Sequence, residues 1–343
     1  MLLKTLSELN AASGAEKAVR EALKEIISPY VDSVFVDKIG NLIAEKKGRL
    51  QGPRVLLAAH MDEIALMVTD ITGDGFLKFK PVGGIDARIL VSKAVKINEN
   101  ITGVIGAKAI HLQKTGERHK ALTYEQLYID IGAKSRDEAS QLVNLGDYAY
   151  FITSFAAFGD GLWKGKALDD RVGCAALVEI LQNEYDFPII AAFTVQEEIG
   201  LRGARVAAYH TEPDFAIVVE TTVAADTLDR QENEWVTEVG KGPACSVMDR
   251  STLYNPKLVR LVTELAAHKG IPLQLRRGGS GGNDAGRIHL SKSGVTTIAL
   301  SVPCRYIHAP VSVISDKDYQ GLISLIDQIL REIPANPFFR KQH

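Results

Sequence analysis

The chain has 343 residues, and at about 150 residues per domain this length predicts two domains. It carries 40 Lys and Arg against 42 Asp and Glu, a net charge of -2. This balance argues against a nucleic-acid-binding protein, which needs a basic surface. A content of 46% hydrophobic and 24% charged residues is typical of a globular protein and argues against a disordered one.

The three cysteines, Cys174, Cys245 and Cys304, form no C-x-x-C pair, which excludes a disulfide framework and a thiolate zinc knuckle. The opening residues lack the long apolar core of a signal peptide. No stretch has the roughly 18 apolar residues that would cross a bilayer. We therefore expect a cytoplasmic protein with no membrane partner.

The first thirty residues predict two helices, the second of which follows a capping box made by Ser13 and Glu16. Short strands are expected at 34–37, 42–44 and 54–59, because these runs are rich in β-branched and aliphatic residues. A Gly-Asn turn separates the first two strands.

The segment from 72 to 159 differs in pattern. Its short strands are punctuated by glycines, and only 135–143 looks helical. This pattern predicts a small β-barrel-like domain inserted into the chain. We expect residues 72–159 to form this β-rich domain, and residues 1–71 and 160–343 to form a second, discontinuous domain.

The second half of the chain alternates strands with amphipathic helices. Such alternation predicts an α/β fold in which a mixed sheet is sandwiched between helices. The expected strands are 189–195, 215–219 and 295–300, and the expected helices are 172–185, 201–209 and 256–269. Asn255 is the expected cap of the last of these helices. A closing helix is expected after a Ser315-x-x-Asp318 box.

Polar residues follow the first long strand. His60 comes directly after 54–59, and Asp62 lies on the same side of an extended chain. Asp62 could therefore accept a hydrogen bond from the imidazole and orient a metal-bound histidine. The alternative is an ordinary strand end with solvated polar residues.

Two pairs of adjacent carboxylates are further candidates. Asp169 and Asp170 open a helix, whose positive dipole end favours anions, so helix capping is the alternative. Glu197 and Glu198 end the strand at 189–195. Adjacent side chains point in different directions, so one could bind a metal while the other acts as a base. The alternative is the acidity common at helix starts.

Two single residues complete the set. Glu220 ends the strand at 215–219, and His308 follows the strand at 295–300, although His308 alone could be an ordinary loop histidine. The carboxyl ends of strands in an open α/β sheet form the rim where ligands bind. Histidines and carboxylates gathered there suit Zn²⁺, Co²⁺ or Mn²⁺. One bridging carboxylate could hold two ions about 3.5–4 Å apart, as in dinuclear hydrolases.

The glycine-rich stretch 277–284 resembles a phosphate-binding loop in its glycine content. It lacks the lysine and the Ser or Thr of that motif, and no clear strand precedes it. A flexible loop is the alternative.

The motifs AAHMDEIALMV, GKALDDRVG, VQEEIGLRGA, GGNDAG and YIHAPVSVI resemble, in the same order, those of the glutamyl-aminopeptidase/tetrahedral (TET) aminopeptidases, metallopeptidase family 42. The resemblance covers most of the chain, including the inserted domain. It implies a zinc-aminopeptidase-like fold and a metal-dependent aminopeptidase that removes N-terminal residues from peptides. It also implies two divalent ions per subunit, Zn²⁺ or Co²⁺ ahead of Mn²⁺.

The ligands that the resemblance implies are His60, Asp169 and Glu220 for one ion, and Asp169 again, Glu198 and His308 for the other. The resemblance also implies a cis peptide bond between Asp169 and Asp170. One position departs from the family, which usually has Asp where this chain has Glu220. Glutamate is one methylene longer and is still a competent oxygen ligand.

The resemblance implies that Glu197 is the general base and that Asp62 orients His60. Gly281, Gly282 and Asn283 would line the substrate cleft. The family forms dimers that assemble into a tetrahedral dodecamer, so we expect a homo-oligomer. The resemblance also implies that residues 72–159 act in dimerisation or oligomerisation and that residues 1–71 and 160–343 form the catalytic domain.

Three other functions are compatible with parts of this pattern. A dinuclear deacylase or carboxypeptidase is disfavoured because the insertion falls between His60 and Asp169, as in the aminopeptidases. A glycosidase with two carboxylates about 5–9.5 Å apart on opposite sides of a sugar fits consecutive glutamates poorly. A non-catalytic binding protein is disfavoured because every ligand position holds a competent residue.

Overall fold

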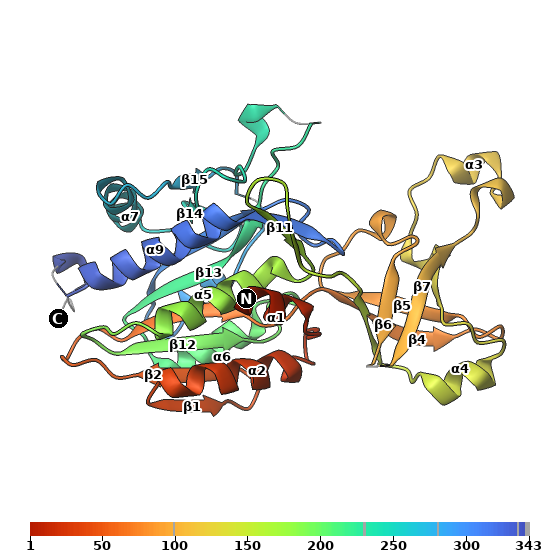
Figure 1. Cartoon of the computed structure of the whole chain (residues 1–343), viewed down its shortest axis with the longest axis horizontal. Helices are drawn as coiled ribbons and strands as arrows, with labels where there is room; N and C mark the ends of the chain where they lie inside the picture. Colours follow the sequence, from red (N-terminus) through yellow and green to blue (C-terminus); the bar gives the residue numbers. More distant parts are fainter. Residues whose placement is uncertain (99, 229–230, 280, 335, 340–343) are drawn as a thin grey trace.

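An eight-stranded mixed sheet forms the centre of the larger part of the molecule (Figure 1). The computed structural model describes residues 1–98, 100–228, 231–279, 281–334 and 336–339; Ser280, in the predicted glycine-rich loop, lies outside them. Across the sheet the strands are β1 (Ser33–Val36), β2 (Leu42–Lys46), β12 (Ile189–Thr194), β3 (Val55–His60), β13 (Phe215–Val223), β16 (Thr296–Cys304), β14 (Ala244–Ser246) and β15 (Gln274–Arg276).

The four central strands, β12, β3, β13 and β16, are parallel to one another. Strands β1, β2 and β14 add antiparallel pairs. Every residue of β3 and of β12 is buried, as expected of parallel strands that are covered on both faces. The predicted α/β fold with a mixed sheet is confirmed.

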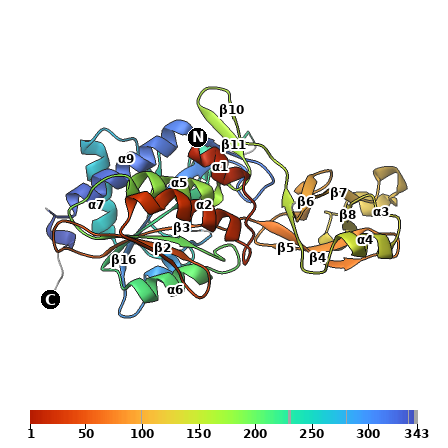
Figure 2. The same cartoon turned by 60° about the horizontal axis from the view of Figure 1, so that its bottom comes forward.

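Helices cover both faces of this sheet (Figure 2). Helices α5 and α9 pack on one face, with α1 and α2 against α5 and α7 against α9, while α6 and α8 pack on the other. Their bounds are α1 (Leu2–Glu8), α2 (Lys17–Ile27), α5 (Leu168–Leu181), α6 (Arg202–Thr211), α7 (Pro256–His268), α8 (Ala285–Ile288) and α9 (Asp316–Glu332).

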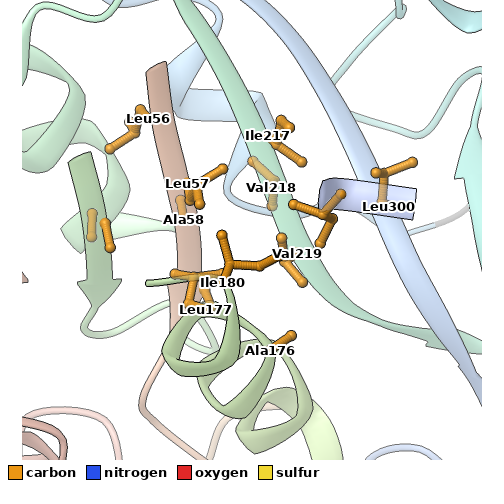
Figure 3. Packing of buried hydrophobic residues seen from close by; sticks show 14 of the residues in the cluster. Leu56, Leu57, Ala58, Ala176, Leu177, Ile180, Ile217, Val218, Val219 and Leu300 are labelled. Carbon is orange, nitrogen blue, oxygen red and sulfur yellow. The ribbon is translucent and has the colours of Figure 1, made fainter. Parts of the chain in front are cut away.

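The core between α5 and the sheet consists of aliphatic side chains (Figure 3). Leu177 and Ile180 of α5 are fully buried, as are Ala58 of β3 and Val219 of β13 beside them. Burying one Leu or Ile side chain contributes about 1.5–3 kcal/mol to folding. This packing holds α5 firmly against β3 and β13, and so fixes the position of its first residues.

A closed antiparallel barrel projects from one end of the sheet domain (Figure 1). Its strands are β4 (Ala65–Ile71), β5 (Leu77–Val82), β8 (Leu127–Asp130), β7 (Ile101–Ala107), β6 (Ala94–Ile97) and β9 (Tyr148–Phe151). The barrel has a hydrophobic core of its own that shares no residue with the core of the sheet. The predicted inserted barrel is confirmed.

Two short α-helices lie in the connections between strands of the barrel, and only one of them was predicted. Helix α4 (Arg136–Leu142) lies within the predicted helical stretch, whereas α3 (Thr115–Arg118) was not predicted. With four residues, α3 is too short to show a hydrophobic period. A small sheet of β10 (Ala156–Phe158), β11 (Leu162–Gly165) and β17 (Ser312–Ser315) follows the barrel.

The capping box predicted before α2 is wrong. The helix begins at Lys17, and no side chain caps it. Instead, Ser13 donates from its hydroxyl to Asp62 at 2.6 Å. Glu16 accepts the backbone N–H groups of Gly14 and Gln196 at 2.7 and 3.2 Å. Both polar side chains therefore bind other parts of the fold.

The other two predicted caps, at Asn255 and Ser315, stand at the correct position before a helix. Asn255 caps α7 through its side chain, as expected. Helix α9 begins after Ser315, but the box does not form. The carboxylate of Asp318 instead accepts the N–H groups of Gly240 and Gly242 at 2.6 and 2.7 Å.

Candidate metal centre

The site lies where the central strands separate at their carboxyl ends. The ladder between β3 and β13 stops at Ala58 and Val218, while the ladder between β12 and β3 continues to His60. The start of α5 enters the gap. Asp170 accepts the N–H of His60 at 3.1 Å and the N–H of Gly173 at 2.8 Å. This buried carboxylate thus ties the end of β3 to the start of α5.

The first residues of α5 are not helical in their backbone angles, at Asp169 and at Asp170. The peptide bond between them is cis, as the family resemblance implied. Gly173 lies directly beneath, and a Cβ atom there would come within 2.4 Å of Asp170 Oδ2 and of the carbonyl oxygen of Val219. Only glycine leaves room for this turn.

Three predicted ligands form a tight cluster. Asp169, Glu198 and His308 each offer a ligand atom, and these atoms all lie within 4.8 Å of one another. His308 Nε2 is 3.4 Å from Asp169 Oδ2 and 3.4 Å from Glu198 Oε2. No other group of three such side chains is this close in the part of the chain that the structure describes.

Asp169 also faces the second predicted imidazole. Its other oxygen, Oδ1, is 3.5 Å from His60 Nε2. The two oxygens of one carboxylate therefore face two histidines, His60 and His308, from different elements. Such an arrangement is suited to a carboxylate that bridges two ions. Glu197 Oε2 is 4.0 Å from His60 Nε2 and so lies beside the same imidazole.

Glu220 belongs to the same cavity but is outside the tight cluster. Strand β13 continues through Glu220 to Val223, further than predicted. The side chain lines a cavity of about 170 Å³ together with His60, Asp169, Glu197 and His308. Its Oε1 accepts a hydrogen bond from Asn283 Nδ2 at 2.7 Å.

Asp62 holds the backbone of both glutamates. Its carboxylate accepts the N–H of Glu197 at 3.0 Å and that of Glu198 at 3.1 Å, as well as the hydroxyl of Ser13. His60 Nδ1 is 3.0 Å from the backbone carbonyl oxygen of Asp62 and 3.5 Å from its carboxylate. The sequence did not indicate the contacts with the glutamate backbone, because they join residues 135 or more positions apart.

Sequence reasoning also missed a buried ion group beneath the site. Lys166 Nζ lies 2.8 Å from both carboxylate oxygens of Glu63, and Arg171 Nη2 lies 3.3 Å from Glu63 Oε1. Arg171 is fully buried and donates to the carbonyl oxygen of Met61 at 2.9 Å. All three charged residues belong to motifs quoted in the sequence analysis. This membership was the one signal by which the sequence could have indicated that they support the site. They hold the loop that follows His60.

Burial and mutual repulsion shift the pKa values of the glutamates toward protonation. Burial raises the pKa of Glu198 to about 7. Burial, helped by the charges of Asp284 and Glu198, raises the pKa of Glu197 well above its usual value. Burial and the charge of Asp169 do the same to Glu220. The site therefore concentrates more negative charge than its own side chains neutralise.

The pKa values of His308 and Asp169 shift the other way, toward the charged form of each group. Burial alone would lower the pKa of His308, but its hydrogen bond to Asp169 and the charge of Glu198 raise it to about 9. Burial alone would raise the pKa of Asp169, but hydrogen bonds from His308 and His60 lower it. Imidazole and carboxylate ligands in one buried group are the donor set of Zn²⁺, Co²⁺ and Mn²⁺ sites. The residues present fit such an ion.

The predicted cleft residues Gly281, Gly282 and Asn283 line the same cavity. The structure adds wall residues that were not predicted: Thr221, Thr222, Val223, Asp249, Arg276 and Ile307. A short strand, β15, precedes the glycine-rich loop, contrary to the prediction of no clear strand.

The three cysteines are buried and unpaired. No helix among the described residues is long and apolar enough to cross a membrane.

Known aminopeptidases resemble this chain over most of its length. The family model for M42 glutamyl aminopeptidases matches residues 40–325. The chain is 34% identical over 346 residues to the lysyl aminopeptidase of Pyrococcus furiosus, covering 98% of each chain. A TET aminopeptidase from Thaumarchaeota archaeon SCGC AB-539-E09 superposes with a TM-score of 0.93 at 36% identity, covering 96% of this chain and 95% of that one.

A second solved structure bears on assembly. The TET1 peptidase of Pyrococcus horikoshii, which can assemble into a tetrahedron or a large octahedral shell, superposes with a TM-score of 0.85. It is 36% identical to this chain and covers 96% of it and 98% of its own length.

Proposed function

Because the chain belongs to the M42 glutamyl aminopeptidases, a family of metallopeptidases, and is an aminopeptidase, we propose that it works through a dinuclear metal centre with Glu197 as general base. The observation that carries the proposal is the placement of Asp169. Its two oxygens face His60 on one side and His308 on the other. A carboxylate placed between two imidazoles suits a bridge between two ions.

The proposed ligands fall into two overlapping sets. One ion would be held by His60, Asp169 and Glu220, and the other by Asp169, Glu198 and His308. The close approach of the second set supports its assignment. Zn²⁺ or Co²⁺ is the expected ion, with Mn²⁺ less suited to the imidazoles. When bound, the ions supply Lewis acidity that lowers the pKa of a water and polarises the scissile carbonyl.

Glu197 moves the proton in this mechanism. Its carboxylate lies beside His60 in the cavity, and its backbone N–H is fixed by Asp62. The raised pKa of Glu197 supports a role as base, because a carboxylate that binds a proton readily can take it from water and return it to the leaving amine. Glu198, whose side chain approaches His308 instead, is left to bind metal.

The acidic lining also supports recognition of a free N-terminus. Glu197 and Glu220 line the cavity, so a free α-amine that enters it would lie beside carboxylate groups that can accept its N–H hydrogen bonds. An N-blocked peptide has no such amine. We therefore propose that substrates are peptides with a free amino end.

The test is hydrolysis of a panel of aminoacyl p-nitroanilides and their N-acetylated counterparts. Chelator-stripped protein is compared with protein refilled with Zn²⁺, Co²⁺ or Mn²⁺, and the metal content is measured in each sample. We expect cleavage of the unblocked compounds only, and only after refilling. Full activity in protein shown to contain no metal would refute the metal centre, and cleavage of blocked compounds would refute amine recognition.

We propose, in addition, that the chain forms a homo-oligomer, with a tetrahedral dodecamer as the expected form. The likeness to the Pyrococcus horikoshii TET1 peptidase supports this. The barrel also exposes apolar side chains that an assembly would cover, including Ile110, Leu112 and Leu145.

A further inference from the structure

The carboxylate of Glu220 is held by a chain of hydrogen bonds that the proposed mechanism does not use. Asn283 Nδ2 donates to Glu220 Oε1 at 2.7 Å and to the hydroxyl of Tyr254 at 3.2 Å. The Tyr254 hydroxyl donates to Asp249 Oδ2 at 2.9 Å. Asn283, Tyr254 and Asp249 are 4%, 4% and 7% exposed, so the chain is shielded from bulk water.

The direction of each hydrogen bond follows from the two ends of the chain. The backbone N–H of Ala285 donates to Asn283 Oδ1 at 2.9 Å, so the amide nitrogen must face the other way, toward Glu220. Tyr254 has one hydroxyl proton. Asp249 Oδ2 accepts it because this oxygen is nearer to the hydroxyl than Asn283 Oδ1 is, at 2.9 against 3.4 Å. Both hydrogens of Asn283 Nδ2 are then used, one by Glu220 and one by Tyr254.

The far end of the chain is anchored. Asp249 Oδ1 accepts the N–H of Ser251 at 2.7 Å, the hydroxyl of Ser251 at 2.8 Å and the N–H of Thr252 at 2.9 Å. With the Tyr254 hydroxyl, four donors converge on one carboxylate. Asp249 therefore has little freedom to move, and neither has the amide that Tyr254 restrains.

We propose that Asn283 is a positioning residue that fixes Glu220 Oε1 and leaves Oε2 for the ion shared with His60 and Asp169. This inference rests on the proposed dinuclear function. Glutamate has one more rotatable bond than the aspartate usual at this position, so an unrestrained Glu220 would lose more conformational entropy on binding an ion. Asn283 removes that freedom before the ion arrives. Groups that orient metal ligands typically change metal affinity by about 10–100-fold when removed.

The experiment measures ion binding rather than catalysis. Metal-free, full-length protein is titrated with Zn²⁺ by calorimetry, and bound metal is counted by elemental analysis. The wild type should bind two ions. Asn283→Ala should bind one ion as before and the other about 10–100-fold more weakly. Tyr254→Phe keeps the hydrogen bond to Glu220 and loses its anchor, so a smaller loss for the same ion is expected.

Tyr209→Phe is the matched control. It is the same change as Tyr254→Phe, made at an exposed tyrosine of α6 that takes no part in the chain from Asp249 to Glu220, so both affinities should match the wild type. If Asn283→Ala does not fold, as judged by circular dichroism, Tyr254→Phe decides the question. Wild-type affinity for both ions in Tyr254→Phe would then overturn the proposal.

A double-mutant cycle separates positioning of Glu220 from a general effect on the fold. In the Glu220→Asp background the carboxylate is one methylene shorter and recedes from Asn283 Nδ2. Adding Asn283→Ala there should change the ion affinity by less than about threefold. An equal loss in both backgrounds would overturn the proposal, because Asn283 would then act without Glu220.

The two proposals fail in different ways. A wild type that binds fewer than two ions contradicts the dinuclear centre, and the positioning role falls with it. A wild type with two ions, together with an Asn283→Ala variant that binds both within twofold of normal, overturns only the positioning role.

Discussion

A single carboxylate, that of Asp62, sets the position of two glutamates with different proposed roles. It accepts the backbone N–H of Glu197 and of Glu198. These bonds hold the turn after β12 through its backbone, independently of the two glutamate side chains. Successive side chains on this fixed backbone point in different directions, and Glu198 approaches His308 while Glu197 lies beside His60. One residue can therefore serve as ligand and its neighbour as base.

Glu197→Gln tests the proposed base. Glutamine has the same shape but cannot take a proton, so kcat should fall by about 10²–10⁴-fold while two ions stay bound. Steady-state kinetics on a p-nitroanilide and metal analysis of the same sample measure both quantities. Glu21→Gln, the same change on the exposed face of α2, should leave kcat unchanged. Near-normal turnover in Glu197→Gln would show that another group is the base.

Asp284 gives a pH dependence of stability. Thr194 donates to its Oδ2 at 2.6 Å, whereas its buried Oδ1 has no hydrogen-bond partner among the described residues. Burial raises the pKa of Asp284 from 3.8 to about 6. A carboxyl group whose pKa is raised by folding stabilises the fold below its unfolded pKa, and this stabilisation is lost as the pH rises through the folded value.

The metal-free protein should therefore lose about 2 kcal/mol of its free energy of unfolding between pH 4 and 6 through Asp284 alone. Asp284→Asn should lack that part of the slope. Urea unfolding of the wild type and the variant at pH 4, 5, 6 and 7 measures the difference. Parallel pH profiles for the two proteins would mean that Asp284 titrates alike in the folded and unfolded states.

The sequence predicts the ligand-type residues of the site because they stand in compact motifs at strand ends. It could not predict what the polar residues around them bind. Asn283 was expected in the cleft wall, but its contact with Glu220 joins a loop to strand β13, and these two segments meet only after folding. The multiple roles of Asp62 have the same origin. Whether the ligand-type residues hold metal stays a prediction.

At the scale of elements, the start of α5 is the part of the fold most closely tied to the site. Packing of Leu177 and Ile180 fixes the body of the helix against the sheet (Figure 3). Its first turn departs from helical geometry at Asp169 and Asp170, so both carboxylates reach the gap between β3 and β13. At Gly173 of the helix, a Cβ atom would come within 2.4 Å both of Asp170 in the turn and of Val219 in strand β13.

Gly173→Ala should therefore destabilise both the helix start and the metal centre. The added Cβ would meet Asp170 Oδ2 and the Val219 carbonyl at 2.4 Å, and the forced shift should lower the free energy of unfolding by about 1–3 kcal/mol. Urea unfolding and Zn²⁺ titration measure the two effects. Gly116→Ala in α3, where a Cβ meets nothing within 4 Å, is the control and should be neutral or slightly stabilising. Equal behaviour of the two variants would contradict this account.

Helix starts show where sequence patterns succeed and fail. The side chain of Asn255 caps α7 by accepting the backbone N–H of Lys257, as its pattern predicts. Ser13, Glu16 and Asp318 match capping patterns equally well, but each binds a group distant in the sequence. A capping pattern describes only local options, so it cannot show that a tertiary partner offers a better one.

At the scale of the whole molecule, the barrel projects from the sheet domain (Figure 1), and the two parts have separate hydrophobic cores. The change from helix-strand alternation to short strands with glycines predicted this organisation from sequence. The separate cores support our proposal that the chain divides into a catalytic domain and an inserted domain. The proposed boundaries at 72 and 159 stay predictions.

The assembly proposal makes a prediction at the same scale. If the chain forms a tetrahedral dodecamer, its mass in solution should be twelve times the 37.3 kDa of one chain. Size-exclusion chromatography with light scattering measures this mass at several protein concentrations. A mass of one chain at every concentration would contradict the homo-oligomer, and an intermediate mass would replace the dodecamer with a smaller assembly.

The strands that lie side by side at the site are distant along the chain. The ribosome therefore makes the residues of the site at different times. His60 and Asp169 leave the ribosome first, Glu198 and Glu220 follow, and His308 comes after β16 has been made. A nascent chain has no complete cluster of Asp169, Glu198 and His308 until the last of these emerges. If this cluster holds metal as we propose, peptide hydrolysis begins only after His308 has been made and has reached the site, so a shorter nascent chain does not attack other newly made peptides.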